Sequence, residues 1–128
     1  MLADRRIWIV EDEFLLAIEL QHTMEDHGAA VIGPSRSLDE ALDALNQMSH
    51  YPDAAILDLD LQGEESFPVA ERLQAIGIPF LFNTGHGDRR ELKDRFGGVT
   101  VCIKPTSEKE ILQCLADLTS ADGTPHYQ

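Results

Sequence analysis

Five short apolar runs alternate with five segments of helical periodicity along this chain of 128 residues. Continuous apolar runs of this length are typical of strands that are covered on both faces, as in parallel sheets. Strands that alternate with helices predict a doubly wound α/β fold, with helices on both faces of one parallel sheet. We expect strands at residues 7–10, 29–32, 54–57, 79–82 and 99–103.

The segments between these strands carry helix start signals. Ser37 and Glu40 have the spacing of a capping box, and Ser107 and Glu110 repeat it. In such a box the serine oxygen accepts a hydrogen bond from the third residue of the helix. Helices are expected near residues 14–27, 38–48, 67–76, 88–96 and 108–118.

Length and composition indicate one soluble domain. The hydrophobic content of 43% and charged content of 26% are ordinary for a globular chain. No apolar stretch approaches the roughly 20 residues that span a bilayer, and no signal peptide is visible. We expect a domain over residues 1–119 and a flexible polar tail over 120–128. Cys102 and Cys114 lack CxxC spacing, which favours reduced thiols and a cytoplasmic location.

The net charge of −13 restricts the partners of this chain. Nucleic-acid binding depends on Lys and Arg at phosphates, and anionic membranes attract the same residues. We therefore expect neither direct nucleic-acid binding nor membrane binding.

Polar residues stand at the ends of four predicted strands. Glu11 and Asp12 follow the first strand, Asp58 ends the third, Thr84 follows the fourth and Lys104 ends the fifth. The carboxyl ends of parallel strands meet at one sheet edge, where doubly wound folds bind their ligands. We expect these five side chains to converge there.

The chemistry of this set favours phosphoryl transfer. Three converging carboxylates repel one another unless a cation intervenes, and oxygen ligands suit Mg²⁺. Phosphoryl transfer needs a positioned nucleophile and charge neutralisation, for which Lys104 and the Thr84 hydroxyl are suited. Asp58 is the expected nucleophile and phosphoryl acceptor.

The ordered set Glu11-Asp12, Asp58, Thr84 and Lys104-Pro105 resembles the signature of bacterial response-regulator receiver domains (CheY-like) along nearly the whole chain. This resemblance implies a flavodoxin-like (βα)5 fold with a five-stranded parallel sheet in the order 2-1-3-4-5. It also implies that Asp58 takes a phosphoryl group from a phosphohistidine of a sensor histidine kinase or a histidine phosphotransfer protein.

The resemblance also implies roles for individual residues. Asp12 and Asp58 would bind Mg²⁺ directly, Glu11 would act through water, and Asp60 would contribute its backbone carbonyl. Thr84 and Lys104 would bind the phosphoryl oxygens.

Three further positions follow from the same resemblance. Pro105 would follow a cis peptide. Asp60 and His86 flank the expected path of attacking water, and we expect them to tune the lifetime of the acyl phosphate.

Residues 79–85 also resemble a receiver subgroup with a Pro-Phe-x-Phe-Ala-Thr-Gly-x-Tyr stretch (FATGUY). Asn83 replaces its Ala and Gly87 replaces its Tyr. Val101 stands where receivers usually have an aromatic residue, and Gln62 stands where Pro is common.

We expect a stand-alone phosphoacceptor, with self-catalysed phosphotransfer and autodephosphorylation, rather than a conventional enzyme. No output domain is visible after Leu118. Phosphorylation would therefore signal to a protein partner through the surface of the fourth strand, fourth helix, fifth strand and last helix.

Two alternatives remain open. Asp58-Leu59-Asp60 resembles the nucleophile motif of small phosphohydrolases of the haloacid-dehalogenase type, although that motif normally opens its domain. The chain could also be a pseudo-receiver that binds partners without phosphorylation.

Overall fold

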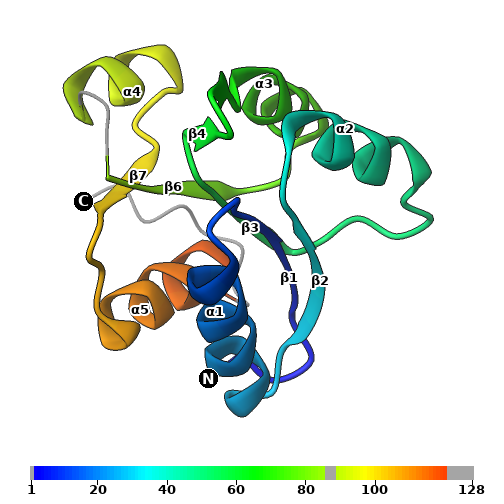
Figure 1. The fold of residues 1–128 in the computed structure, drawn as a ribbon. Coiled ribbons are helices and arrows are strands. Elements are labelled where there is room, and N and C mark those ends of the chain that lie inside the picture. The colour runs from blue at the N-terminus through cyan, green and yellow to red at the C-terminus, as the bar shows by residue number, and fades with distance from the viewer. Residues whose placement is uncertain (1, 86–88, 121–128) are drawn as a thin grey trace.

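A five-stranded parallel sheet runs through the middle of the protein, with helices on both of its faces (Figure 1). The computed structural model describes residues 2–85 and 89–120. The strand order is β2-β1-β3-β6-β7, which confirms the predicted order 2-1-3-4-5. The strands are β1 (Arg6–Val10), β2 (Ala30–Ser35), β3 (Ala54–Leu57), β6 (Phe80–Thr84) and β7 (Thr100–Ile103).

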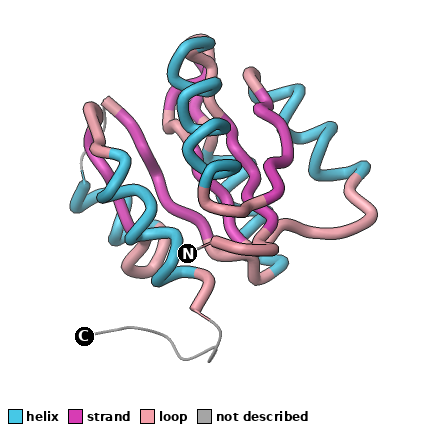
Figure 2. The backbone as a smooth tube through the Cα atoms, turned by 90° about the horizontal axis from the view of Figure 1, so that it is seen from below, coloured by secondary structure: helices cyan, strands magenta, loops and turns pink. Residues whose placement is uncertain are grey.

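Two helices cover one face of this sheet and three cover the other, and Figure 2 shows the strands between these layers. α1 (Phe14–Asp26) and α5 (Glu108–Leu118) share the first face. α2 (Leu38–Gln47), α3 (Phe67–Ile76) and α4 (Arg89–Arg95) cover the second. Successive strand residues point to opposite faces, so each strand supplies two apolar cores.

The β1 strand shows this division directly. Ile7 and Ile9 belong to the core beneath α1 and α5, whereas Trp8 and Val10 belong to the core beneath α2, α3 and α4. All four side chains are fully buried. A strand covered on both faces in this way accounts for the uninterrupted apolar run in the sequence.

Both predicted capping boxes have the expected serine bond. The Glu40 N–H donates to Ser37 Oγ over 3.1 Å, and the Glu110 N–H donates to Ser107 Oγ over 3.0 Å. The Glu40 carboxylate in turn accepts from the N–H of Arg36, one residue before the cap. These bonds begin α2 and α5 where the sequence predicts.

The structure extends two strands beyond their predicted ends. β6 includes Asn83 and Thr84, which pair in register with Cys102 and Ile103 of β7. Sheet pairing thus continues through two polar residues that read as a loop in the sequence. β2 likewise continues to Ser35, which pairs with Val10.

A small hairpin follows β3 where only a turn was expected. Its strands are β4 (Asp60–Leu61) and β5 (Glu64–Glu65), which pair antiparallel. The two turn residues, Gln62 and Gly63, have φ of 55° and 88°. Positive φ at both positions is the requirement of a type I′ hairpin turn.

Three predictions concern residues that the structure does not describe. His86, Gly87 and residues 121–128 of the expected tail lie outside the described ranges. Within residues 2–85 and 89–120, no helix is both long enough and apolar enough to cross a membrane.

Candidate functional site

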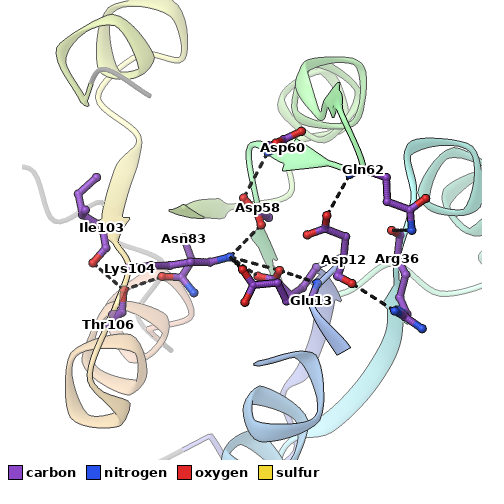
Figure 3. Close-up of polar contacts among 11 residues, drawn as sticks. Asp12, Glu13, Arg36, Asp58, Asp60, Gln62, Asn83, Ile103, Lys104 and Thr106 are labelled. Carbon is purple, nitrogen blue, oxygen red and sulfur yellow. Dashed lines mark hydrogen bonds and ion pairs between the residues drawn. The ribbon is translucent and has the colours of Figure 1, made fainter. Parts of the chain in front are cut away.

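The carboxyl ends of the strands bring Asp12, Asp58 and Lys104 together (Figure 3). Glu11 and Asp12 follow β1, Asp58 follows β3, and Lys104 follows β7. Carboxylate oxygens of Glu11, Asp12 and Asp58 all lie within 4.8 Å of one another. The parallel strand order alone accounts for this convergence of distant segments.

Lys104 ties the two buried acids together. Its Nζ lies 2.8 Å from Asp58 Oδ2 and 3.0 Å from Glu11 Oε1. Glu11 and Asp58 are only 1% and 5% exposed. Their charges are therefore compensated mainly from within the protein, with Lys104 as a direct partner.

This cluster carries an excess of negative charge. Burial, followed by the charge of Asp58, raises the pKa of Glu11 to about 8, although hydrogen bonds from Glu13 and Lys104 oppose the shift. Burial alone would lower the pKa of Lys104, but hydrogen bonds and ion pairs with Asp58 and Glu11 raise it. The site therefore favours binding of a proton or a cation. Three carboxylates within 4.8 Å form a donor set that fits a hard divalent cation.

Backbone amides hold the same carboxylates. Asp58 Oδ1 accepts from the N–H of Asp60 over 3.2 Å, and Asp12 Oδ2 accepts from the N–H of Gln62 over 3.0 Å. Glu11 Oε2 accepts from the N–H of Glu13 over 3.1 Å. The loops after β1 and β3 thus orient the acids without occupying all of their oxygen lone pairs.

A small cavity of about 120 Å³ opens beside Asp58. Its lining residues are Asp12, Glu13, Asp58, Asp60, Gly85 and Lys104. Acid, cation and loop backbone thus surround one space next to the candidate nucleophile.

Thr84 and Asp60 make further contacts beside this cluster. Thr84 is fully buried at the end of β6, where its carbonyl oxygen accepts from the N–H of Lys104 over 2.9 Å. The Asp60 carboxylate accepts from the N–H of Gly63 over 3.0 Å, so this side chain also supports the hairpin turn. The Lys104-Pro105 peptide is cis.

Two polar contacts near the site were not anticipated from the sequence. Thr106 Oγ1 donates to Oδ1 of the buried Asn83 over 2.6 Å. Gln62 and Arg36 form the second contact, between loops that are 26 residues apart. The only sequence signals were Asn83 and Gln62 themselves, as departures from the residues usual at their positions.

Comparison with known proteins points to one class. No family model matches the chain. The sensory transduction protein LytT of Bacillus subtilis is 32% identical over 114 residues, which is 86% of this chain and 46% of LytT. The transcriptional regulatory protein PdtaR of Mycobacterium tuberculosis is 23% identical over 114 residues, 87% of this chain and 55% of PdtaR. The chain thus spans about half the length of the curated relatives it matches.

Solved structures resemble the whole domain. The non-phosphorylated HemR receiver domain of Leptospira biflexa has a TM-score of 0.79 at 29% identity, covering 97% of this chain and 100% of that one. A response regulator receiver protein of Burkholderia phymatum has a TM-score of 0.80 at 25% identity, covering 91% and 95%.

In strand order, in the acids at the strand ends and in these likenesses, the chain has the fold of response-regulator receiver domains and is similar to them over nearly its whole length. This confirms the resemblance predicted from the sequence. The comparisons do not favour the phosphohydrolase or the pseudo-receiver alternative.

Proposed function

We propose that Asp58 accepts a phosphoryl group from a phosphohistidine and that the phosphorylated domain signals through protein contacts. The observation that carries this proposal is the shared setting of Asp58. Its carboxylate lines a small cavity together with a second acid, Asp12, and with the Lys104 ammonium group 2.8 Å away.

In the proposed reaction, an oxygen of Asp58 bonds to phosphorus while the P–N bond of the phosphohistidine breaks. The electron pair of that bond leaves with the imidazole of the donor. Lys104 and the Thr84 hydroxyl would bind the transferred phosphoryl oxygens. Autodephosphorylation would return the free carboxylate when water attacks the acyl phosphate.

Mg²⁺ fits the donor set of this site. Asp12 and Asp58 would bind it directly, Glu11 would act through water, and the Asp60 carbonyl would complete the protein ligands. When bound, the ion neutralises negative charge on the phosphoryl group.

The proposed partners are proteins. A sensor histidine kinase or a histidine phosphotransfer protein would supply the phosphoryl group in the cytoplasm. A downstream target would bind the surface of β6, α4, β7 and α5. The net charge of −13 disfavours direct contact with nucleic acid or an anionic membrane. We assign the receiver domain to residues 1–119.

Phosphorylation can be tested with a small phosphodonor such as phosphoramidate. The proposal expects a stoichiometric, Mg²⁺-dependent and hydroxylamine-sensitive label that is lost in Asp58→Ala and retained in Asp94→Ala, which removes an exposed acid of α4. Turnover of a phosphomonoester would instead support a hydrolase. Failure of every phosphodonor in the presence of Mg²⁺ would support a pseudo-receiver.

Asp60 and His86 are proposed to tune the lifetime of the acyl phosphate. Asp60 lines the cavity beside Asp58. Its substitution by Asn keeps an oxygen for the Gly63 N–H and removes the charge. The rate of phosphate loss in Asp60→Asn should therefore differ from that of the unaltered protein, and an unchanged half-life would contradict this role.

A further inference from the structure

Arg36 and Gln62 join three loops at the edge of the site (Figure 3). Arg36 lies between β2 and α2, and Gln62 lies in the turn of the β4–β5 hairpin. The Gln62 side chain donates from Nε2 to the Arg36 carbonyl oxygen over 3.1 Å. Arg36 donates from its guanidinium to the Asp12 carbonyl oxygen over 3.3 Å. The loops that follow β1, β2 and β3 are thus connected to one another.

The connection between Gln62 and Arg36 extends to Asp12. Among the clustered acids Glu11, Asp12 and Asp58, Asp12 is the most exposed. Lys104 contacts the buried carboxylates of Glu11 and Asp58. Asp12 is half-buried, and its carboxylate accepts from the Gln62 N–H over 3.0 Å. Asp12 is therefore held at two points, by Gln62 at the carboxylate and by Arg36 at the backbone.

Arg36 is itself held in place by its neighbours. Its N–H donates to the Glu40 carboxylate over 3.2 Å, at the start of α2. Its guanidinium carbon lies 5.3 Å from the centre of the Phe14 ring at the start of α1, within range of a cation–π contact. The Arg36 carbonyl is thus a stationary acceptor for Gln62.

A proline at position 62 could make neither bond of Gln62. Proline has no N–H to donate to Asp12 and no side-chain amide to donate to Arg36. Its φ is fixed near about −65°, whereas Gln62 has a φ of 55°. Both hydrogen bonds therefore depend on Gln62, which stands in this chain where receivers commonly have Pro.

We propose that Gln62 and Arg36 are positioning residues that hold Asp12 in the geometry for binding Mg²⁺. This inference rests on the proposed function, because it assigns Asp12 as a ligand. Groups that orient metal ligands through hydrogen bonds commonly change metal affinity by about 10–100-fold when they are removed. Without the bond from the Gln62 side chain to Arg36, the hairpin turn would be less fixed, and the Gln62 N–H would donate to the Asp12 carboxylate for a smaller fraction of the time.

The direct test is calorimetric titration of the unphosphorylated full chain with Mg²⁺. Gln62→Ala keeps the backbone N–H and the net charge, and we expect its Mg²⁺ affinity to fall by about tenfold. Gln62→Glu keeps the side-chain length but cannot donate to the Arg36 carbonyl. Its added charge would by itself strengthen cation binding, so weaker binding by this variant as well supports positioning.

Arg36→Ala separates positioning from simple electrostatics. Loss of a cation near three acids would tighten Mg²⁺ binding, whereas loss of the connection would weaken it. We therefore expect Arg36→Ala to bind Mg²⁺ more weakly. The double variant Arg36→Ala with Gln62→Ala should lose less Mg²⁺ affinity than the product of the two single fold-changes, because both residues act through one connection. The matched control is Arg72→Ala. Arg72 of α3 is, like Arg36, an exposed arginine, and it donates to Asn46 of α2 rather than to a residue of the site.

Phosphorylation kinetics supply a second measurement. A positioning role raises the Mg²⁺ concentration for half-maximal phosphorylation in Gln62→Ala and leaves the rate at saturating Mg²⁺ within about threefold. Mg²⁺ affinity of Gln62→Ala and Gln62→Glu within twofold of the unaltered protein would overturn the inference and leave the proposed function standing. An unaltered protein that binds no Mg²⁺ would contradict both.

Discussion

The Nζ atom of Lys104 lies 2.8 Å from Oδ2 of Asp58, and both side chains are largely buried. The same nitrogen lies 3.0 Å from Glu11 Oε1. The candidate acceptor is thus paired with a cation before any phosphoryl group arrives. The neighbouring acid Glu11 is buried in the same cluster and competes for that cation.

Lys104→Met is expected to destabilise the protein strongly. Removal of one partner from a buried ion pair commonly costs about 3–5 kcal/mol, because the remaining charge is left uncompensated. We expect the free energy of unfolding to fall by about 3 kcal/mol, measured by urea unfolding at pH 8 in the presence of a metal chelator. Lys93→Met removes an exposed lysine of α4 and serves as the control. Equal effects of the two substitutions would contradict the prediction.

Stability of the metal-free protein should fall as the pH rises from about 5 to about 8 because of Glu11. Burial and the charge of Asp58 raise the pKa of Glu11 from 4.5 to about 8, so the folded state holds a proton that the unfolded state has released. Each pH unit in this window lowers stability by at most about 1.4 kcal/mol for this group. Glu11→Gln removes this titration, because glutamine has no carboxyl group. Urea unfolding at several pH values should give a shallower slope for this variant, and identical slopes would exclude the effect.

Thr106→Val should lower the free energy of unfolding by more than the double change Asn83→Leu with Thr106→Val does. The Thr106 hydroxyl donates to Oδ1 of the buried Asn83 over 2.6 Å. Loss of the hydroxyl alone leaves a buried acceptor without this donor, at about 1–3 kcal/mol, whereas replacement of both partners by apolar groups of similar shape can be nearly neutral. Thermal and urea unfolding of the two single variants and the double variant measure the coupling. Strictly additive effects would show that the pair is independent.

Arg95→Ala should loosen α4, and the cause should be stacking rather than the ion pair. The Arg95 guanidinium lies 3.8 Å from the centre of the Phe67 ring, and the same side chain pairs with Glu71 at 3.3 Å. An exposed ion pair contributes about 0–1 kcal/mol, and an exposed cation–π contact adds about 0.5–1 kcal/mol. We expect faster amide hydrogen exchange in α4 for Arg95→Ala and little change for Glu71→Gln. A larger effect of Glu71→Gln would reverse this assignment.

The fold was predictable because its signals are local. Apolar runs of strand length and the capping serines Ser37 and Ser107 mark most element positions without reference to distant residues. Topological rules for parallel sheets then bring Asp12, Asp58 and Lys104 to one edge. The β4–β5 hairpin was not predicted, because neither Gln62 nor a two-residue strand carries a distinctive local signal.

Contacts between loops were the part that local patterns could not supply. The Gln62 N–H meets an Asp12 oxygen 50 residues away, and the Gln62 side chain meets the Arg36 carbonyl 26 residues away. Similarly, Asn83 reads as a loop residue in the sequence, whereas in the structure it pairs with β7 and its Oδ1 accepts from the Thr106 hydroxyl.

The sequence by itself determined the parallel α/β architecture and the set of residues at the strand ends, because burial on both faces and strand order leave few alternatives. The tertiary structure decided which of those acids are buried with Lys104, and which one accepts hydrogen bonds from Gln62 and Arg36. Hydrogen bonds form only between groups that approach one another closely and at a suitable angle, and only the packed positions of the loops decide which groups do so.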